Sequence, residues 1–343
     1  MLRNGSISGQ CYCSSNIDRS VNSSNFCSSL KQPAEYKFAN SNEIEELVNS
    51  IAKSNPVLAK SSDISLNEWI SQFETQDDRI IALKLLENFE YYDIKKARNA
   101  LKRLHQELMS RIDAEEDKKL DQVVFLFAGN AKSGAMMAYL YSQANCIKVK
   151  GELHKEMKNG QIKEKFYPLE KIESHKFINT LKHDGVKNLV IIDDIIMNGG
   201  GIGYYFTPSI REGFKQFAKV FCIILVANNI GLTRTKDGWP ERNAPPIPNF
   251  EPIYDKEVLN FDDPDNHNFT CNEKVMIQKW LDKYMQIIDP SQEKKFDRSK
   301  SLVGFDWNIP GTTPLPFCFS TNKWKALFQR YSGEIVHKII TGE

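Results

Sequence analysis

Two adjacent carboxylates, followed shortly by a run of glycines, are the residues of this chain best suited to chemistry. Asp193 and Asp194 end a short apolar run, and a glycine-rich turn begins after four further residues. Paired carboxylates can accept hydrogen bonds from the two hydroxyls of a ribose. Glycines allow positive φ angles and bring backbone N–H groups close to a phosphate. The spacing predicts a ribose 5-phosphate site, in which the phosphate is bound by Met197, Asn198, Gly199, Gly200 and Gly201. A buried strand with an ordinary glycine turn is the structural alternative.

A second glycine loop precedes this stretch. The apolar run 123–128 is followed by Gly129, four further residues and Gly134, and then by a helical pattern over 135–143. A strand, a glycine loop and a helix N-terminus form an anion-binding arrangement. The loop is not a Walker loop, because Lys132 and Ser133 come before the second glycine rather than after it.

Two further features have both a functional and a structural interpretation. The polar segment 151–168 contains His154, Lys155 and Lys158, and it reads equally as a substrate-covering loop or as an exposed hairpin. Trp239 lies in a proline-rich segment, where an aromatic face can stack on a base. Packing inside the protein is the commoner role for such a tryptophan.

Alternating strand and helix patterns must position these residues. The acid pair ends a strand over 188–193, and the pattern around it predicts β-α-β units in a mostly parallel, doubly wound sheet. In such a sheet, ligands bind at the carboxyl ends of the strands. Further strands are predicted over 123–128, 146–150, 220–227 and 301–306. Helices are predicted over 42–52, 65–73, 78–89, 93–113, 135–143, 169–183, 205–219, 272–288 and 324–331.

These patterns divide the chain into three parts. Residues 1–34 are rich in Ser and Asn and predict a disordered or loosely attached tail. Residues 35–120 predict a helical extension, whose basic helix over 93–113 we interpret as having a solvated face. Residues 121–335 predict the α/β domain, in which 229–335 form an irregular lid or C-terminal extension.

Composition limits the classes of function. The 343 residues carry a formal net charge of +1, which gives no global electrostatic case for nucleic acid or membrane binding. No apolar run approaches the length that spans a bilayer, and no apolar signal segment is visible at the N-terminus. The seven cysteines are odd in number and scattered, and Cys146 and Cys222 lie in apolar runs that resemble core strands. We therefore expect reduced thiols and a cytoplasmic protein.

The run from Val190 to Gly201 resembles the PRPP-binding motif of type I phosphoribosyltransferases. That motif is an apolar strand, two acids, four residues that commonly end in Thr, and Gly-Gly-Thr. Here Asn198 and Gly201 stand where Thr is usual, so the phosphate would lose two hydroxyl donors. The resemblance implies that Asp193 and Asp194 hold the ribose diol and stabilise positive charge developing at C1′.

The resemblance also assigns roles outside the motif. It implies that Lys132 is catalytic and neutralises the leaving pyrophosphate, which would be bound by Gly129, Ser133 and Gly134. The loop with His154, Lys155 and Lys158 would close over the substrate. Mg²⁺ is expected as cofactor, held through the substrate rather than by a direct protein ligand, although Asp193 or Asp194 could also bind it.

A longer part of the chain, roughly residues 65–330, resembles one subgroup of these proteins, the PRTase-CE group. These are divergent phosphoribosyltransferase-like proteins of bacterial conflict systems, including effectors encoded beside retron reverse transcriptases. The features that carry this resemblance are the helical prefix, Leu85-Leu86-Glu87-Asn88, the Lys132-Ser133-Gly134 loop, the acid–glycine motif, and Asn308-x-Pro310-x-x-Thr313-x-Leu315-Pro316.

The resemblance leaves three functions open. The first is an effector of anti-phage defence that binds PRPP or a related nucleotide and acts on it by glycosyl transfer or by cleavage of an N-glycosidic or pyrophosphate bond. The second is a catalytically degenerate regulator that binds PRPP or a nucleotide. The third is a scaffold that docks a reverse transcriptase–nucleic acid complex, and a homo-oligomer is compatible with each of them.

Overall fold

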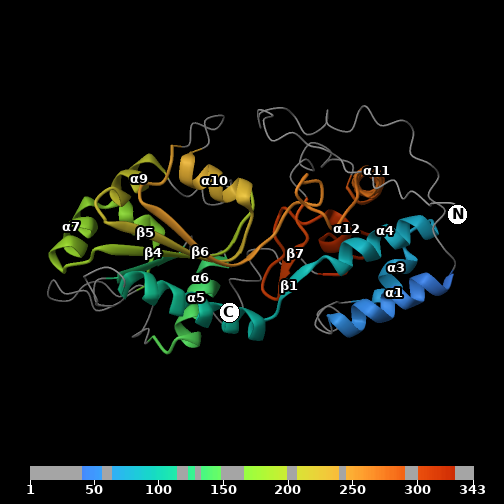
Figure 1. Cartoon of the computed structure of the whole chain (residues 1–343), viewed down its shortest axis with the longest axis horizontal. Helices are drawn as coiled ribbons and strands as arrows, with labels where there is room; N and C mark the ends of the chain where they lie inside the picture. The colour runs from blue at the N-terminus through green and yellow to red at the C-terminus, as the bar shows by residue number, and fades with distance from the viewer. Residues whose placement is uncertain are drawn as a thin grey trace, which may run out of the picture. The chain divides into compact units, whose positions relative to one another are not determined.

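A parallel five-stranded sheet lies at the centre of the α/β part, with the strand order β3-β2-β4-β5-β6 (Figure 1). The computed structural model describes residues 41–55, 64–113, 123–127, 133–147, 166–198, 207–238, 245–289 and 300–328. Its strands are β2 (Val123–Phe127), β3 (Phe166–Pro168), β4 (Asn188–Ile196), β5 (Lys219–Ala227) and β6 (Phe250–Glu257). All neighbouring strands in this sheet pair in parallel. Because β4 and β5 are buried on both faces, their sequences are nearly continuous apolar runs.

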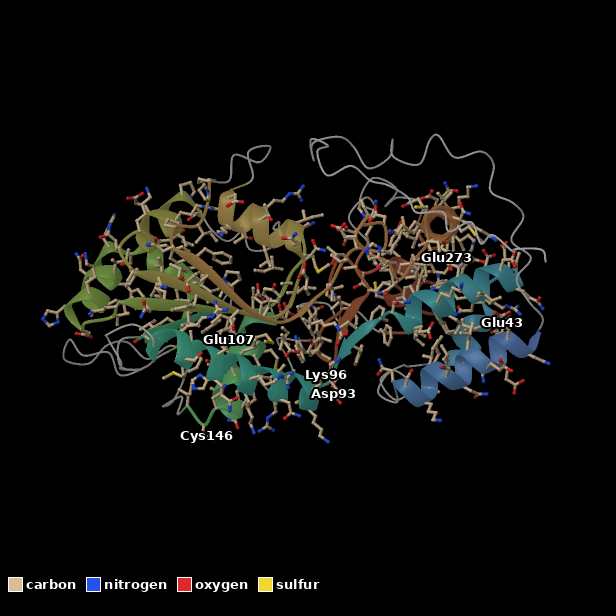
Figure 2. All side chains as sticks on the ribbon, viewed as in Figure 1. Glu43, Asp93, Lys96, Glu107, Cys146 and Glu273 are labelled. Carbon is tan, nitrogen blue, oxygen red and sulfur yellow. The ribbon has the colours of Figure 1, made fainter. Side chains whose placement is uncertain are left out.

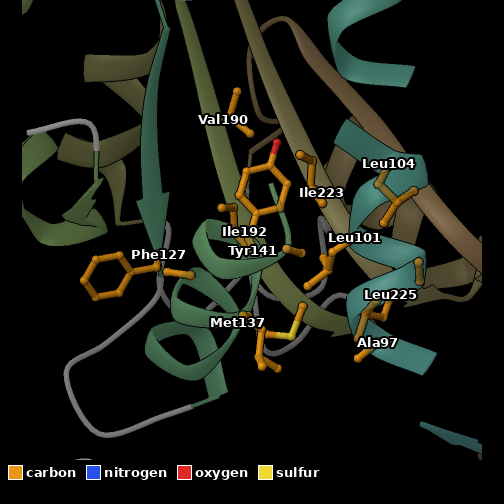
Figure 3. Packing of buried hydrophobic residues seen from close by; sticks show 14 of the residues in the cluster. Ala97, Leu101, Leu104, Phe127, Met137, Tyr141, Val190, Ile192, Ile223 and Leu225 are labelled. Carbon is orange, nitrogen blue, oxygen red and sulfur yellow. The ribbon is translucent and has the colours of Figure 1, made fainter. Parts of the chain in front are cut away.

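Helices cover both faces of this sheet. On one face, α6 (Ser133–Ala144) packs against β2 and β4, and α5 (Ile94–Asp113) packs against β5 and β6, in one core that includes Val190 and Ile192. Figure 3 shows Tyr141 of α6 and Leu101 of α5 in this core. The other face is covered by α7 (His175–His183), the 3-10 helix η3 (Leu169–Glu173) and α9 (Pro208–Phe214). The predicted doubly wound α/β fold is confirmed.

The strand order reverses direction at one point of the sheet. Strand β2 pairs with β3 on one side and with β4 on the other, so the chain leaves β2 and β4 in opposite directions along the sheet. In open α/β sheets this topological switch point is where ligands bind, outside the carboxyl ends of the strands. The switch point here lies between the ends of β2 and β4.

The N-terminal helices share a second core with the C-terminal residues. This core combines residues of α3 (Leu66–Ser71) and α4 (Gln76–Glu87) with residues of α11 (Cys271–Ile288) and α12 (Leu315–Cys318). α1 (Ser41–Ser54) packs against it through partly buried apolar side chains and the buried Ile51. Aromatic rings dominate its centre, where they pack at centroid distances near 5 Å; they include Trp69, Phe73, Trp280, Tyr284, Phe317 and Trp324.

A two-stranded parallel sheet borders both cores. β1 (Glu90–Tyr92) pairs with β7 (Val303–Phe305), which is more than 200 residues further along the chain. Tyr91 packs in the aromatic core, whereas the next residue, Tyr92, packs in the core between α5 and the large sheet. The predicted strand over 301–306 is therefore present as β7, but it does not join the large sheet.

Side-chain caps define several helix starts. Thr75 and Asp78 form a capping box at α4, and Thr270 and Glu273 form another at α11. Asp93 accepts a hydrogen bond from the backbone N–H of Lys96 in the first turn of α5 (Figure 2). These caps stabilise helix starts that periodicity alone locates only approximately.

Several predicted elements differ in the structure. Cys146, placed in a predicted strand over 146–150, is exposed and has a φ of 54° in a turn after α6, and residues beyond 147 lie outside the described part. Among the described residues, the second strand of the large sheet in chain order is the short β3. Residues 324–328 form a bridge and turns rather than the start of the predicted helix over 324–331. The predicted helix over 205–219 is shorter, and α9 ends at Phe214.

The segment after Asn228, predicted to be irregular, contains α10 (Asn229–Asp237) and β6. Strand β6 was missed because Pro252 lies inside it, and proline has no N–H to donate to a neighbouring strand. Such a residue is tolerated at the edge of a sheet, and β6 is an edge strand. None of the described helices is both long enough and apolar enough to cross a bilayer.

Candidate functional site

Strand register places the acid pair at the switch point of the sheet. Phe127, the last residue of β2, pairs with Ile192 of β4. Asp193 is therefore the first β4 residue beyond the end of β2, while β4 continues along β5 as far as Ile196. At the two carboxylates, the neighbouring strand β2 has therefore ended, whereas the other neighbour, β5, still pairs with β4. In open α/β sheets, ligands bind at this position, outside the carboxyl ends of the strands.

Asp194 is fully buried and is held by neutral donors. The hydroxyl of Ser133 and the indole N–H of Trp307 both donate to its carboxyl group, the latter with 3.3 Å between Nε1 and Oδ2. Burial raises the pKa of Asp194 above its usual value, and the hydrogen bonds from Ser133, Asp193 and Trp307 offset only part of this effect. Asp194 therefore holds its proton to higher pH than an exposed carboxyl group would.

Asp193 is also almost completely buried, and it pairs in register with Ile224 of β5. Its Oδ1 accepts a hydrogen bond from the backbone N–H of Asp194 at 2.9 Å. Cys222 of β5 lies nearby, and burial together with the charge of Asp193 raises the pKa of this thiol well above its usual value. Cys222 is therefore a protonated core residue, as the apolar run around it predicts.

The contact between Ser133 and Asp194 brings the two predicted anion-binding segments together. Ser133 is the first residue of α6, and Gly134 is buried in the first turn of the same helix. The amino end of a helix carries a partial positive charge and unpaired N–H groups. The structure thus places the start of the predicted pyrophosphate loop helix against the predicted ribose-binding acid. Gly129 and Lys132 lie outside the described residues.

The exit of β4 toward the glycine turn is attached to α10. The backbone N–H of Asn228, the N-cap of α10, donates to the carbonyl of Ile196 at 2.7 Å. Further along, Arg234 donates from Nη1 to the carbonyl of Asn198 at 3.2 Å. Met197 is buried beneath Gly231, which approaches it so closely that a Cβ at position 231 would lie 2.6 Å from the Met197 carbonyl oxygen.

Several predicted site residues fall outside the described part of the chain. These are Gly199, Gly200 and Gly201 of the phosphate turn, His154, Lys155 and Lys158 of the polar loop, and Trp239. Their assignments remain predictions from the sequence.

Two residues that contact predicted site residues were not themselves predicted as site residues. Trp307 comes from the C-terminal part of the chain and lies directly before the motif that begins at Asn308. Arg234 lies in α10, in a segment that the prolines had made look irregular. The only local signal for Trp307 was a large aromatic residue beside that motif, and nothing local connected it with Asp194.

The acid pair supplies the oxygen ligands that Mg²⁺ prefers. Among the residues that the structure describes, no group of three or more His, Cys, Asp or Glu side chains could hold a metal ion by themselves. The donor set therefore fits a cation held largely by the oxygens of a phosphorylated ligand and only partly by Asp193 or Asp194.

A doubly wound parallel sheet with an acid pair at its switch point defines a phosphoribosyltransferase-like protein. The chain belongs to the PRTase-CE family, whose model matches residues 66–330. Among solved structures, the chain is similar to the AQ2163 protein from Aquifex aeolicus at 13% sequence identity, covering 64% of this chain and 85% of that one with a TM-score of 0.25. No curated protein matches this chain.

Proposed function

We propose that this protein binds PRPP or a closely related ribose phosphate, together with Mg²⁺, at the carboxyl ends of β2 and β4, and that it acts on this ligand. The observation that carries the proposal is the contact between Ser133 and Asp194 at the switch point. It supports a single site in which the amino end of α6 faces the pyrophosphate and the acid pair faces the ribose.

The residues of the chain would act by binding and by charge. Asp193 and Asp194 would accept hydrogen bonds from the 2′- and 3′-hydroxyls and stabilise positive charge that develops at C1′ as pyrophosphate leaves. Lys132, Gly129, Ser133 and Gly134 would bind the leaving pyrophosphate.

The remaining groups would bind the other end of the ligand. The 5′-phosphate would lie against the turn formed by Met197, Asn198, Gly199, Gly200 and Gly201, and Trp239 would stack on a base. Mg²⁺, when bound, would neutralise charge on the pyrophosphate and ribose oxygens, with Asp193 or Asp194 as its protein ligand.

Binding and turnover are measured separately. Calorimetry with PRPP and Mg²⁺ should show binding to the wild type and its loss in the Asp193→Asn, Asp194→Asn double variant. Phosphorus NMR of the same mixtures should show release of pyrophosphate by the wild type alone. The matched control is Glu45→Gln with Glu46→Gln, which alters an adjacent acid pair that is exposed on α1. Absence of binding at millimolar PRPP with Mg²⁺ contradicts the proposal.

In the cell, we propose that this activity is that of a toxic effector in a retron-type anti-phage system, in which a reverse transcriptase–nucleic acid complex is the partner. Membership of the PRTase-CE family supports this proposal. Expression of the wild type should arrest growth and change the pools of PRPP or nucleotides, while the double Asp variant should do neither. Equal toxicity of both proteins would exclude a role for the acid pair.

Two observations favour a second candidate, a regulator that binds the ligand without turning it over. Asp194 already accepts hydrogen bonds from Ser133 and Trp307 inside the protein, and Asn198 stands where a Thr hydroxyl is usual. Both features reduce the groups available to stabilise a transition state. Calorimetric binding of PRPP with no release of pyrophosphate, across a panel of nucleobases as acceptors, would select this alternative.

A further inference from the structure

Trp307 reaches the acid pair from a part of the chain that lies outside the large sheet. It follows β7, is 113 residues from Asp194 in sequence, and is 7% exposed. Its indole N–H is the donor to Asp194 Oδ2, and its ring stacks on Phe305 with 5.1 Å between the centroids and an interplanar angle of 25°. The ring is therefore fixed by packing on one side while its polar atom contacts the acid.

A tight turn sets the direction of this indole. The backbone N–H of Phe305 donates to the carbonyl of Asn308, and the N–H of Asn308 donates to the carbonyl of Phe305, at 3.0 and 3.1 Å. Asp306 and Trp307 are the two residues at the tip of this turn. A turn closed by two reciprocal bonds has little freedom, so the tip residues point in defined directions.

The other tip residue anchors the turn. Asp306 accepts hydrogen bonds from the Tyr91 hydroxyl and from the backbone N–H of Ile94, both at 3.0 Å. Its own N–H donates to the carbonyl of Tyr92 at 3.0 Å. The turn is thus held to the end of β1 and to the first residue of α5 by three hydrogen bonds, which makes Trp307 a preorganised donor.

We propose that Trp307 is a positioning residue, which holds the Asp194 carboxyl group in the orientation that accepts a ribose hydroxyl. This inference rests on the proposed function. An ionised carboxyl group has about four lone-pair sites. The indole N–H occupies one of them on Oδ2 and fixes the plane of the group, while Ser133 and Asp193 contact the same carboxyl group. Trp307 need not touch the ligand to have this effect.

The test compares two buried tryptophans whose N–H groups have different acceptors. In Trp307→Phe, the ring and its stacking on Phe305 are kept but the donor to Asp194 is lost. In the control Trp324→Phe, the donor that is lost bonds to the carbonyl of Pro316 at 3.1 Å, in the aromatic core. Calorimetry with PRPP and Mg²⁺ should show affinity about tenfold weaker for Trp307→Phe and within about twofold of wild type for Trp324→Phe.

A double-mutant cycle separates positioning from general packing. If Trp307 acts through Asp194, adding Trp307→Phe to Asp194→Asn should weaken PRPP binding no further. An undiminished tenfold loss in the Asp194→Asn background would overturn the inference, as would equal affinities of Trp307→Phe and wild type. An equal loss in Trp324→Phe would overturn it as well. Failure of the wild type to bind PRPP would instead overturn the proposed function and this inference with it.

A measurement on the wild-type chain covers the case in which Trp307→Phe does not fold. The chain has five tryptophans, so the indole N–H resonance of Trp307 can be assigned in ¹⁵N NMR spectra by elimination with Phe variants at the other four. Addition of PRPP and Mg²⁺ should shift the Trp307 resonance and leave that of Trp324 in place. A Trp307 resonance that stays unchanged while calorimetry shows binding would overturn the inference.

Discussion

Arg234 donates a hydrogen bond from Nη1 to the backbone carbonyl of Asn198, with 3.2 Å between the two atoms. Asn198 is the last described residue before the glycine turn, and Arg234 lies on α10, which follows the neighbouring strand β5. A guanidinium group therefore lies at the entrance of the turn that we propose binds the 5′-phosphate. In this position it can stabilise the turn and also contribute positive charge.

Replacing Arg234 should weaken ligand binding. Arg234→Ala removes the hydrogen bond to Asn198 and the charge, for an expected loss of about 0.5–1.5 kcal/mol, or roughly three- to tenfold in the affinity for PRPP. Calorimetry with PRPP and Mg²⁺ measures this loss. The control is Lys236→Ala, which removes an exposed cation from the same helix. Equal affinities of Arg234→Ala and wild type would show that the guanidinium has no part in the site.

Gly231 should not tolerate a side chain. A Cβ at this position would lie 2.6 Å from the Met197 carbonyl oxygen and 2.8 Å from the Met197 carbonyl carbon, and neither backbone atom can move aside cheaply. We expect Gly231→Ala to reduce the free energy of unfolding by about 1–3 kcal/mol, because α10 must shift away from the end of β4. Thermal unfolding measures the change. Thr233→Ala, which alters an exposed residue of the same helix, should leave the midpoint nearly unchanged.

The aromatic core should lose stability in acid through Asp78. Burial alone would raise the pKa of Asp78, but hydrogen bonds from Lys283, Thr75 and Tyr284 outweigh this and hold it below its usual value of 3.8. Lys283 Nζ and the Tyr284 hydroxyl lie 2.8 and 2.9 Å from Asp78 Oδ2. A lowered folded-state pKa means that the unfolded chain binds the proton more readily. The stabilisation is therefore present above the unfolded pKa and is lost as pH falls through the folded one.

Unfolding midpoints measured between pH 7 and pH 2.5 test this effect. The wild type should lose more stability below about pH 4 than Asp78→Asn, which has no carboxylate to protonate. Asp77→Asn, which changes the exposed neighbouring acid, should follow the wild-type curve. Parallel curves for wild type and Asp78→Asn would show that Asp78 does not contribute to the acid sensitivity.

The motif that begins at Asn308 should act through stability. Thr313 is buried, and its hydroxyl donates to the carbonyl of Val303 in β7 at 2.7 Å. Thr313→Val keeps the shape but leaves this carbonyl without its donor, for an expected loss of about 1–3 kcal/mol in the free energy of unfolding. Thr180→Val removes a similar bond, from the Thr180 hydroxyl to the Lys176 carbonyl on an exposed helix. Water can replace that bond, so denaturant unfolding should show a much smaller loss.

The central strands and several helices were predictable because their signals are local. Residues 123–127, 188–193 and 219–227 are apolar runs of the length and β-branched content that buried parallel strands require. The stripe Ala97, Leu101, Leu104 and Leu108 in α5 has the three- and four-residue spacing of one helix face, and all four side chains are buried. A helix buried on one face shows a periodic apolar stripe, and a strand buried on both faces shows a continuous apolar run. Either pattern can be recognised in the sequence without knowing which element it packs against.

The errors have equally specific causes. Cys146 lies in a short apolar run, but the chain turns there with a positive φ that composition does not reveal. Strand β6 was missed because it contains Pro252. A proline inside a strand is acceptable only where no neighbouring strand needs its N–H, and the sequence alone does not show which strand lies at the edge of the sheet. Strand β7 was found, but its partner β1 lies over 200 residues away.

The sequence by itself determined that two acids end an apolar strand and that a glycine turn follows, because residue type and spacing within a dozen positions specify both. Only the tertiary structure decided which side chains meet those acids. Ser133 and Trp307 reach Asp194 from separate parts of the chain, and Arg234 reaches Asn198 from a helix beyond the next strand. Such contacts depend on strand order and on how the elements pack, and no local pattern records them.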